Sequence, residues 1–266
     1  MQGRLSPAPT GRPQAFPVST WQQEFDLAAA IGFDRLEWLV TDEGFDDNPL
    51  CTAAGVTAIK ERVATTGVRV TSVCADFCIG RPLVRVSAAE RQSTVDRLQW
   101  LVGQIALIDA QVLLVPLLEQ GAMRNEADEI TVASALAPVL VMAKACGIRI
   151  GLECHLDASR QRALIERTRS TALGAYYDVG NATFAGYEAA AEVRALGAAL
   201  FGVHLKDRPR GGGSVPLGQG GVNFPAVFAA LIEIDYRGTL IMETPVGDDP
   251  VAMATRHLAF VRDRWQ

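Results

Sequence analysis

Residues 148–155 read IRIGLECH, an apolar run that ends in a glutamate and a histidine. Three later runs have the same design: residues 173–180 are LGAYYDVG, residues 201–207 are FGVHLKD, and residues 238–245 are GTLIMETP. Each run has the length and the aliphatic content of a buried parallel strand, and each is followed by loop residues and then a helical pattern. Buried parallel strands that alternate with helices predict an α/β protein.

The same alternation extends towards the N-terminus, with further strands expected at Arg35–Val40, Arg69–Asp76 and Gln111–Leu118. A first strand fits only at Gln2–Leu5, so it is expected to be short or clipped. The sequence predicts a single (β/α)8 TIM barrel over residues 1–266 rather than an open doubly wound sheet. Helices are expected at Thr20–Ile31, Gly55–Thr66, Ala88–Asp109, Glu126–Cys146, Ala158–Arg169, Glu188–Leu200, Phe224–Ile234 and Pro250–Arg264.

Composition and charge narrow the class of protein. The 266 residues carry a net charge of -5 and are 49% hydrophobic, with no apolar run long enough to span a bilayer. An acidic chain does not favour nucleic acid, whose binding needs clustered Lys and Arg. The five cysteines are scattered, which favours reduced thiols, with Cys74 and Cys78 in the core. We expect a cytoplasmic enzyme whose partner is a small molecule rather than a membrane. The sequence does not decide between a monomer and a homo-oligomer.

The four C-terminal strand runs end in residues that can bind a divalent metal: Glu153, Asp178, His204 and Glu243. Residues at the same ends of parallel strands converge at the C-terminal mouth of a barrel, where barrel active sites lie. Three carboxylates and one imidazole suit one divalent ion, Mn²⁺ in first place, with Mg²⁺, Co²⁺ and Zn²⁺ as alternatives. For any single residue, a helix-capping role is the competing interpretation.

The two glutamates come from strands that lie well apart on the ring and could flank a substrate. One carboxylate would remove a proton beside a carbonyl group, and the other would return it to the opposite face. The metal would bind the carbonyl and an adjacent hydroxyl oxygen and stabilise the enediolate between the two steps. This arrangement predicts a stereochemical inversion.

These motifs resemble those of the sugar phosphate isomerase and epimerase superfamily, whose members have a xylose-isomerase-like barrel and include ketose 3-epimerases and pentulose or hexulose phosphate epimerases. The resemblance is carried by Glu153, Asp178 with Asn181, His204 with Lys206 and Asp207, and Glu243, and by the opening MQGRLSP. It implies that the four strand-end residues are metal ligands and that Glu153 and Glu243 are the paired acid and base. It also implies substrate contact by Arg4, at the end of strand one.

At Asn181 the sequence departs from several of these epimerases, which have a substrate-binding histidine three residues after the aspartate. Asparagine can bind a hydroxyl group but cannot relay a proton near neutrality. His155 could contact substrate or support a metal ligand from behind. Glu37 could orient substrate or pair with a nearby Arg or Lys. Lys206 could contact substrate or form an ion pair with Asp207.

The loop from Arg208 to Gly221 contains six glycines. Its residues Arg208, Arg210 and Ser214 could hold a phosphate or a carboxylate, because barrel phosphate sites favour the loops after strands seven and eight. The competing interpretation is a mobile basic loop.

The leading function is therefore a metal-dependent isomerase or epimerase of a small ketose or ketose phosphate. A metal-dependent dehydratase of a cyclic polyol ketone, such as inosose or dehydroshikimate, would use the same ligands and the same proton abstraction. A DNA-repair endonuclease is disfavoured because three histidines are too few for a cluster of metals. A non-catalytic sugar-binding barrel is disfavoured because both bases are present.

Overall fold

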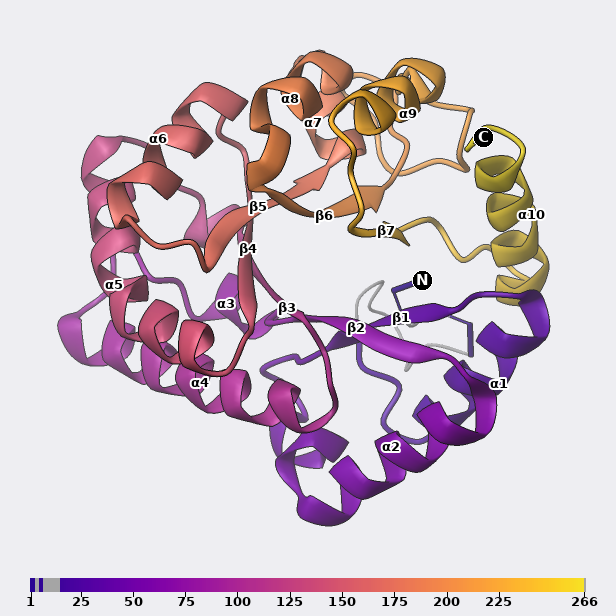
Figure 1. The fold of residues 1–266 in the computed structure, drawn as a ribbon, viewed down its shortest axis with the longest axis horizontal. Coiled ribbons are helices and arrows are strands. Elements are labelled where there is room, and N and C mark those ends of the chain that lie inside the picture. Colours follow the sequence, from indigo (N-terminus) through magenta and orange to yellow (C-terminus); the bar gives the residue numbers. More distant parts are fainter. Residues whose placement is uncertain (3–4, 7–14, 266) are drawn as a thin grey trace.

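The computed structural model describes residues 1–2, 5–6 and 15–265. These residues form seven parallel strands whose order in the sheet follows the order in the chain (Figure 1). The sheet curls into a nearly closed barrel with the helices outside it, as the sequence predicts. The strands are β1 (Arg35–Leu39), β2 (Arg69–Cys74), β3 (Val112–Leu117), β4 (Arg149–Cys154), β5 (Leu173–Asp178), β6 (Leu200–Leu205) and β7 (Thr239–Met242).

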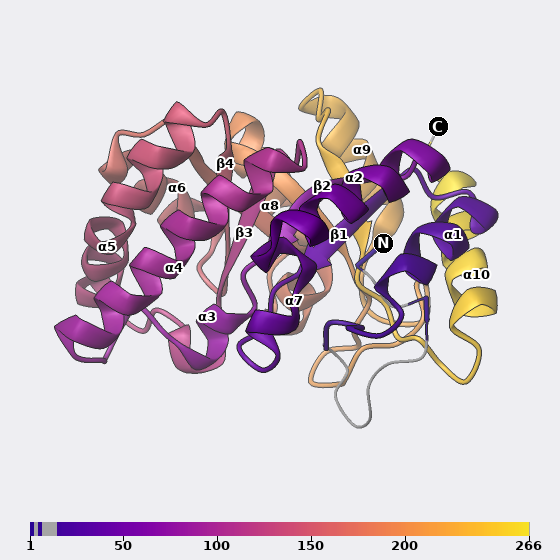
Figure 2. The same ribbon diagram turned by 90° about the horizontal axis from the view of Figure 1, so that it is seen from below.

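The helices surround the barrel, as the view from below also shows (Figure 2). Eight of them correspond to the predicted helices, with ends that differ by a few residues. They are α1 (Trp21–Ile31), α2 (Ala53–Thr66), α4 (Ala88–Leu107), α5 (Glu126–Ala145), α6 (Ala158–Thr168), α8 (Ala189–Leu196), α9 (Phe224–Glu233) and α10 (Pro250–Arg262). Two short helices, α3 (Phe77–Gly80) and α7 (Val179–Ala185), were not predicted.

Two residues take the place of the first strand. The Gln2 backbone N–H donates to Met242 O on β7 (3.2 Å), and the Glu37 N–H on β1 donates to Met1 O (2.9 Å). Met1 and Gln2 thus bridge the two ends of the sheet, which agrees with the expected short first strand. Arg4, the substrate contact implied at this strand, lies outside the described residues.

Helix α7 begins where the sequence predicts that a strand continues to Gly180. Asp178 accepts hydrogen bonds from the backbone N–H groups of Gly180 and Asn181, both at 2.8 Å, and so caps the new helix. The chain also passes close to the end of β6 here. A Cβ atom added to Gly180 would lie only 2.8 Å from Lys206 O. Aspartate is a common N-cap residue, so Asp178 was a local signal for the start of a helix. The predicted strand ran past Asp178 to Gly180, and the signal was therefore overlooked.

Tyr176 fills the barrel interior below the mouth. Its side chain is fully buried, and glycines on both neighbouring strands make room for it. A Cβ atom added to Gly151 would lie 3.0 Å from the Tyr176 side chain, and a Cβ atom added to Gly202 would lie 2.2 Å from the Tyr176 ring. The ring packs edge-on against His204, with centroids 4.8 Å apart, so it supports the mouth from beneath.

The cysteines are free thiols, and Cys74 and Cys78 are buried as predicted, whereas Cys146 is exposed. Over the residues that the structure describes, no helix is both long enough and apolar enough to cross a bilayer.

Candidate active site

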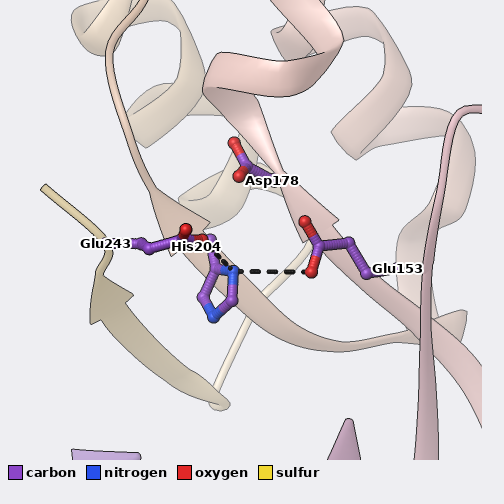
Figure 3. A group of neighbouring side chains, drawn as sticks. All are labelled: Glu153, Asp178, His204 and Glu243. Atoms are coloured by element: carbon purple, nitrogen blue, oxygen red, sulfur yellow. Dashed lines mark ion pairs between the residues drawn. The ribbon is translucent and has the colours of Figure 1, made fainter. Parts of the chain in front are cut away.

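The four predicted metal ligands meet at the carboxyl ends of the strands. Glu153 is the second-last residue of β4, Asp178 ends β5, His204 lies on β6, and Glu243 directly follows β7. All four are buried, and one ligand atom from each lies within 4.8 Å of the others. Figure 3 shows the side chains of Glu153 and Glu243 on opposite sides of His204, with Asp178 beside them. The group could hold a metal ion.

The ligand atoms can be assigned from their contacts. His204 Nδ1 lies 3.0 Å from Glu243 Oε2 and 3.8 Å from Glu153 Oε2 (Figure 3). Asp178 uses Oδ1 to cap α7, which leaves Oδ2 for the cluster. Within the described residues, neither Asp178 Oδ2 nor His204 Nδ1 has a partner with hydrogen-bond geometry, although Lys206 Nζ lies 3.5 Å from Oδ2 and Glu243 Oε2 lies 3.0 Å from Nδ1. A bound cation would satisfy these two buried atoms, which lack well-formed hydrogen bonds.

The electrostatics of the cluster agree with this interpretation. Burial raises the pKa of Glu153 to about 8, and the carboxylates of Asp178 and Glu243 add to the effect. Burial also raises the pKa of Asp178. Burial alone would lower the pKa of His204, but the carboxylates of Glu37 and Glu243 raise it well above its ordinary value. Without metal, the cluster therefore retains protons, which a divalent cation would displace on binding.

Glu37 lies beneath the cluster and fixes the orientation of His204. Its side chain is fully buried, and its Oε1 lies 2.8 Å from His204 Nε2. Its Oε2 accepts from Tyr176 OH (2.6 Å) and Ser72 Oγ (2.7 Å). Gln2 Nε2 donates to Oε1 at 3.2 Å. A histidine that donates to a carboxylate through one nitrogen presents the other to a metal. We call these residues (Glu37, His204, Tyr176, Ser72 and Gln2) the Glu37 network.

The predicted pairing of Glu37 with an Arg or Lys is wrong, whereas its predicted role in orienting substrate stays a prediction. Its partners are a histidine, two hydroxyl groups and an amide rather than an Arg or Lys side chain. Glu37 does not line the cavity that opens above the cluster. His204, which pairs with Glu37, lies 167 positions away in the sequence, so no local pattern indicates this contact.

The predicted ion pair between Lys206 and Asp207 is also absent. Lys206 Nζ donates to Glu243 Oε1 (2.8 Å) and lies 3.5 Å from Asp178 Oδ2. Asp207 points to the other side of the strand, in line with the alternation of side chains. It accepts from the N–H groups of Gly218 and Gly220, both at 2.8 Å, and so holds the glycine-rich loop.

A cavity of about 260 Å³ opens above the cluster. Its wall includes four of the predicted substrate residues, His155, Asn181, Lys206 and Arg208. The prediction missed other polar residues of the wall. Asp76 and Glu119 follow strands, as the predicted carboxylate ligands do, so their strand-end positions could have indicated that they line the site. Gln2 does not follow a strand, and no such signal was available for it. The wall consists of Gln2, Cys74, Asp76, Ile79, Pro116, Leu118, Glu119, Glu153, His155, Asn181, Lys206, Arg208 and Glu243.

The loop residues divide into one that reaches the cavity and two that do not. Arg208 stacks on the Phe184 ring, 4.0 Å from its centroid, and donates to Asn181 Oδ1 at 2.9 Å. Asn181 Nδ2 in turn donates to Glu153 Oε1 at 3.2 Å. Arg210 and Ser214 are exposed and do not belong to the cavity wall, which argues against the predicted contact with substrate.

The fold and the strand-end cluster together define a barrel of the xylose-isomerase type. The sequence model of the family described as "Xylose isomerase-like TIM barrel" matches residues 25–264, and the chain belongs to this family. The resemblance inferred from the motifs is therefore confirmed.

Two curated relatives match over nearly their whole length. The chain is 28% identical to a protein of Escherichia coli (strain K12) provisionally named L-ribulose-5-phosphate 3-epimerase SgbU, over 93% of this chain and 92% of the relative. It is 26% identical to L-ribulose-5-phosphate 3-epimerase UlaE of Shigella flexneri serotype 5b (strain 8401), over 92% and 89%. D-psicose 3-epimerase of Clostridium cellulolyticum H10, solved with D-tagatose, has the same fold, with a TM-score of 0.76 at 16% identity over 93% and 94% of the two chains.

Proposed function

We propose that this protein is a divalent-metal-dependent 3-epimerase of a ketose phosphate. The curated relatives, which are named as pentulose phosphate 3-epimerases, support a sugar epimerase as its general activity. The observation that carries the proposed mechanism is the position of Glu153 and Glu243 on opposite sides of His204 Nδ1 (Figure 3).

The donor set fits a metal, since it combines three carboxylates with an imidazole whose second nitrogen is held by Glu37. When bound by Glu153, Asp178, His204 Nδ1 and Glu243, a divalent ion would supply electrophilic stabilisation of negative charge on the substrate oxygens.

The two glutamates would move the proton. One carboxylate removes the hydrogen from C3 as a proton, and the electron pair left on C3 is delocalised into the C2 carbonyl as an enediolate. The other carboxylic acid then returns a proton to the opposite face of C3. Lys206 orients Glu243 and Asn181 orients Glu153, each through one hydrogen bond to Oε1. Holding both groups in position lowers the barrier, because no rearrangement is needed at the moment of transfer.

Arg208 would hold the phosphate. Within the described residues its hydrogen-bond partners, Asn181 Oδ1 and Gly212 O, are uncharged, and no carboxylate forms an ion pair with it. A guanidinium group in a cavity wall without an anionic partner suits a phosphate ligand. Of the three residues predicted to hold an anion (Arg208, Arg210 and Ser214), this proposal keeps Arg208, which belongs to the cavity wall.

The test follows hydrogen exchange with solvent. L-ribulose 5-phosphate is incubated with Mn²⁺-loaded protein in D₂O, and the product is analysed for configuration and for deuterium at C3. We expect the C3 epimer with deuterium incorporated, and a fall in turnover of about 10²-fold or more in both Glu153→Gln and Glu243→Gln. One of these variants should still exchange the C3 hydrogen without making the epimer.

Two results would contradict the proposal. An epimer that contains no deuterium, made by the unaltered protein, would exclude proton transfer through the two carboxylates. Loss of water from a cyclic polyol ketone, seen as enone absorbance, together with no epimerisation of ketose phosphates, would identify the protein as a dehydratase.

A further inference from the structure

Three buried polar atoms of the barrel mouth have no hydrogen-bond partner in the described part of the chain: Asp178 Oδ2, His204 Nδ1 and Gln2 Oε1. The candidate metal cluster accounts for the first two, because Asp178 and His204 are members of it. Gln2 is not a member, so its orphaned oxygen requires another explanation. A buried acceptor without a donor destabilises the protein, and such atoms mark places where a ligand supplies the missing partner.

The orientation of the Gln2 amide is determined by its neighbour. Gln2 Nε2 lies 3.2 Å from Glu37 Oε1, and a carboxylate can only accept, so the amide nitrogen must face it. The carbonyl oxygen therefore points away from Glu37. Gln2 belongs to the cavity wall and Glu37 does not. The Glu37 network thus holds in the cavity wall an amide whose unused acceptor is itself buried, so a hydroxyl group that reaches Oε1 must displace part of the wall around it.

We infer that Gln2 Oε1 accepts a hydrogen bond from the C1 hydroxyl group of the substrate. The inference rests on the proposed function, in which C2 and C3 lie between Glu153 and Glu243 and Arg208 holds the phosphate. Around the mouth, Arg208 follows β6, Glu243 follows β7, and Gln2 lies between β7 and β1. Gln2 and Arg208 are therefore on either side of Glu243, so a ketose phosphate anchored at Arg208 extends its C1 hydroxymethyl group towards Gln2.

This contact would make Gln2 a specificity residue. A site that is built to hydrogen-bond a hydroxyl group rejects the analogue that lacks it, because the buried acceptor is then left unpaired. The protein would accordingly prefer 2-ketose phosphates with a free C1 hydroxyl group to their 1-deoxy analogues.

The experiment compares kcat/KM for L-ribulose 5-phosphate and its 1-deoxy analogue. We expect the unaltered protein to prefer the hydroxylated compound by about tenfold or more, a typical value for one hydrogen bond to a buried acceptor. Gln2→Leu should lose most of this preference, mainly through slower turnover of the hydroxylated compound. Gln2→Met, which also lacks the acceptor, provides a second variant in case the first does not fold.

Ser72→Ala is the matched control. It removes a hydrogen bond of 2.7 Å to the same Glu37 carboxylate, but Ser72 does not belong to the cavity wall. It should therefore keep the preference for the hydroxylated compound. A Ser72→Ala variant that loses the preference as fully as Gln2→Leu would overturn the inference, because the effect would then pass through Glu37.

Two other results would overturn it: an unaltered protein that does not discriminate between the compounds, or Gln2 variants that bind Mn²⁺ more weakly and keep the full preference. If the unaltered protein epimerises neither compound, the proposed function fails separately. Calorimetric binding of the same two compounds then decides the role of Gln2, with the same preference expected for the unaltered protein and lost in the variants.

Discussion

Replacing Glu37 by glutamine tests whether the buried carboxylate prepares His204 for a metal. Glutamine has nearly the same size, so the packing against Tyr176 and Ser72 is retained. Those two hydroxyl groups can turn to accept from the new NH₂ group, which leaves the amide oxygen for His204 Nε2. The substitution therefore removes mainly the negative charge from the 2.8 Å contact with His204.

The loss can be given a magnitude. A hydrogen bond to a charged group contributes about 1.5–3 kcal/mol, and each 1.4 kcal/mol corresponds to about tenfold in a binding constant. Loss of a residue that supports a metal ligand from behind typically costs about 10–100-fold in affinity, which is the same range. We therefore expect Glu37→Gln to weaken Mn²⁺ binding by about 10–100-fold.

The assay is competition between the protein and a fluorescent chelator for Mn²⁺, with thermal unfolding recorded in parallel. Glu24→Gln is the matched control, because Glu24 is also a buried glutamate but accepts from the Leu5 and Ser6 backbone instead. It should lower stability and leave Mn²⁺ affinity unchanged. An Mn²⁺ affinity of Glu37→Gln within twofold of the unaltered protein, in a folded variant, would refute the reasoning.

Three further predictions concern the loop, the close approach at α7 and the metal-free cluster. Arg208→Ala should raise KM for a ketose phosphate by about tenfold and leave KM for the unphosphorylated ketose almost unchanged. Arg210→Ala, at an exposed position, should leave both KM values unchanged. Equal effects of Arg208→Ala on the two substrates would contradict the phosphate role. Gly180→Ala should lower the free energy of unfolding by about 1–3 kcal/mol, because its Cβ would lie 2.8 Å from Lys206 O; an unchanged urea midpoint would contradict this. In EDTA, stability should fall as pH rises from about 4.5 to about 8, because folded Glu153, with a pKa of about 8, holds a proton that the unfolded chain releases. In Glu153→Gln the side chain cannot ionise, so Tm should fall less over this pH range. Identical pH profiles for the variant and the unaltered protein would contradict the role given to Glu153.

The alternation of apolar strands and helices was readable from the sequence, because the burial of a strand is recorded in its own residues. IRIGLECH predicted β4 and also predicted that Glu153 lies at its end. The same reasoning located Asp178, His204 and Glu243, since parallel strands in one sheet end at the same edge. The barrel and the cluster of four were thus predictable, while the single domain, the metal and the roles of the residues stay predictions.

The tertiary structure decided which polar side chains pair with one another. Glu37 and His204 are 167 residues apart, and nothing in either strand run indicates that Glu37 turns to the histidine rather than to a substrate. Lys206 contacts Glu243 because side chains alternate along the end of β6. Arg208, and not Arg210, lies in the cavity wall because Asp207 anchors the loop that follows β6. Hydrophobic periodicity is a property of a segment, but a buried hydrogen bond depends on the positions of two segments, which exist only once the barrel has closed.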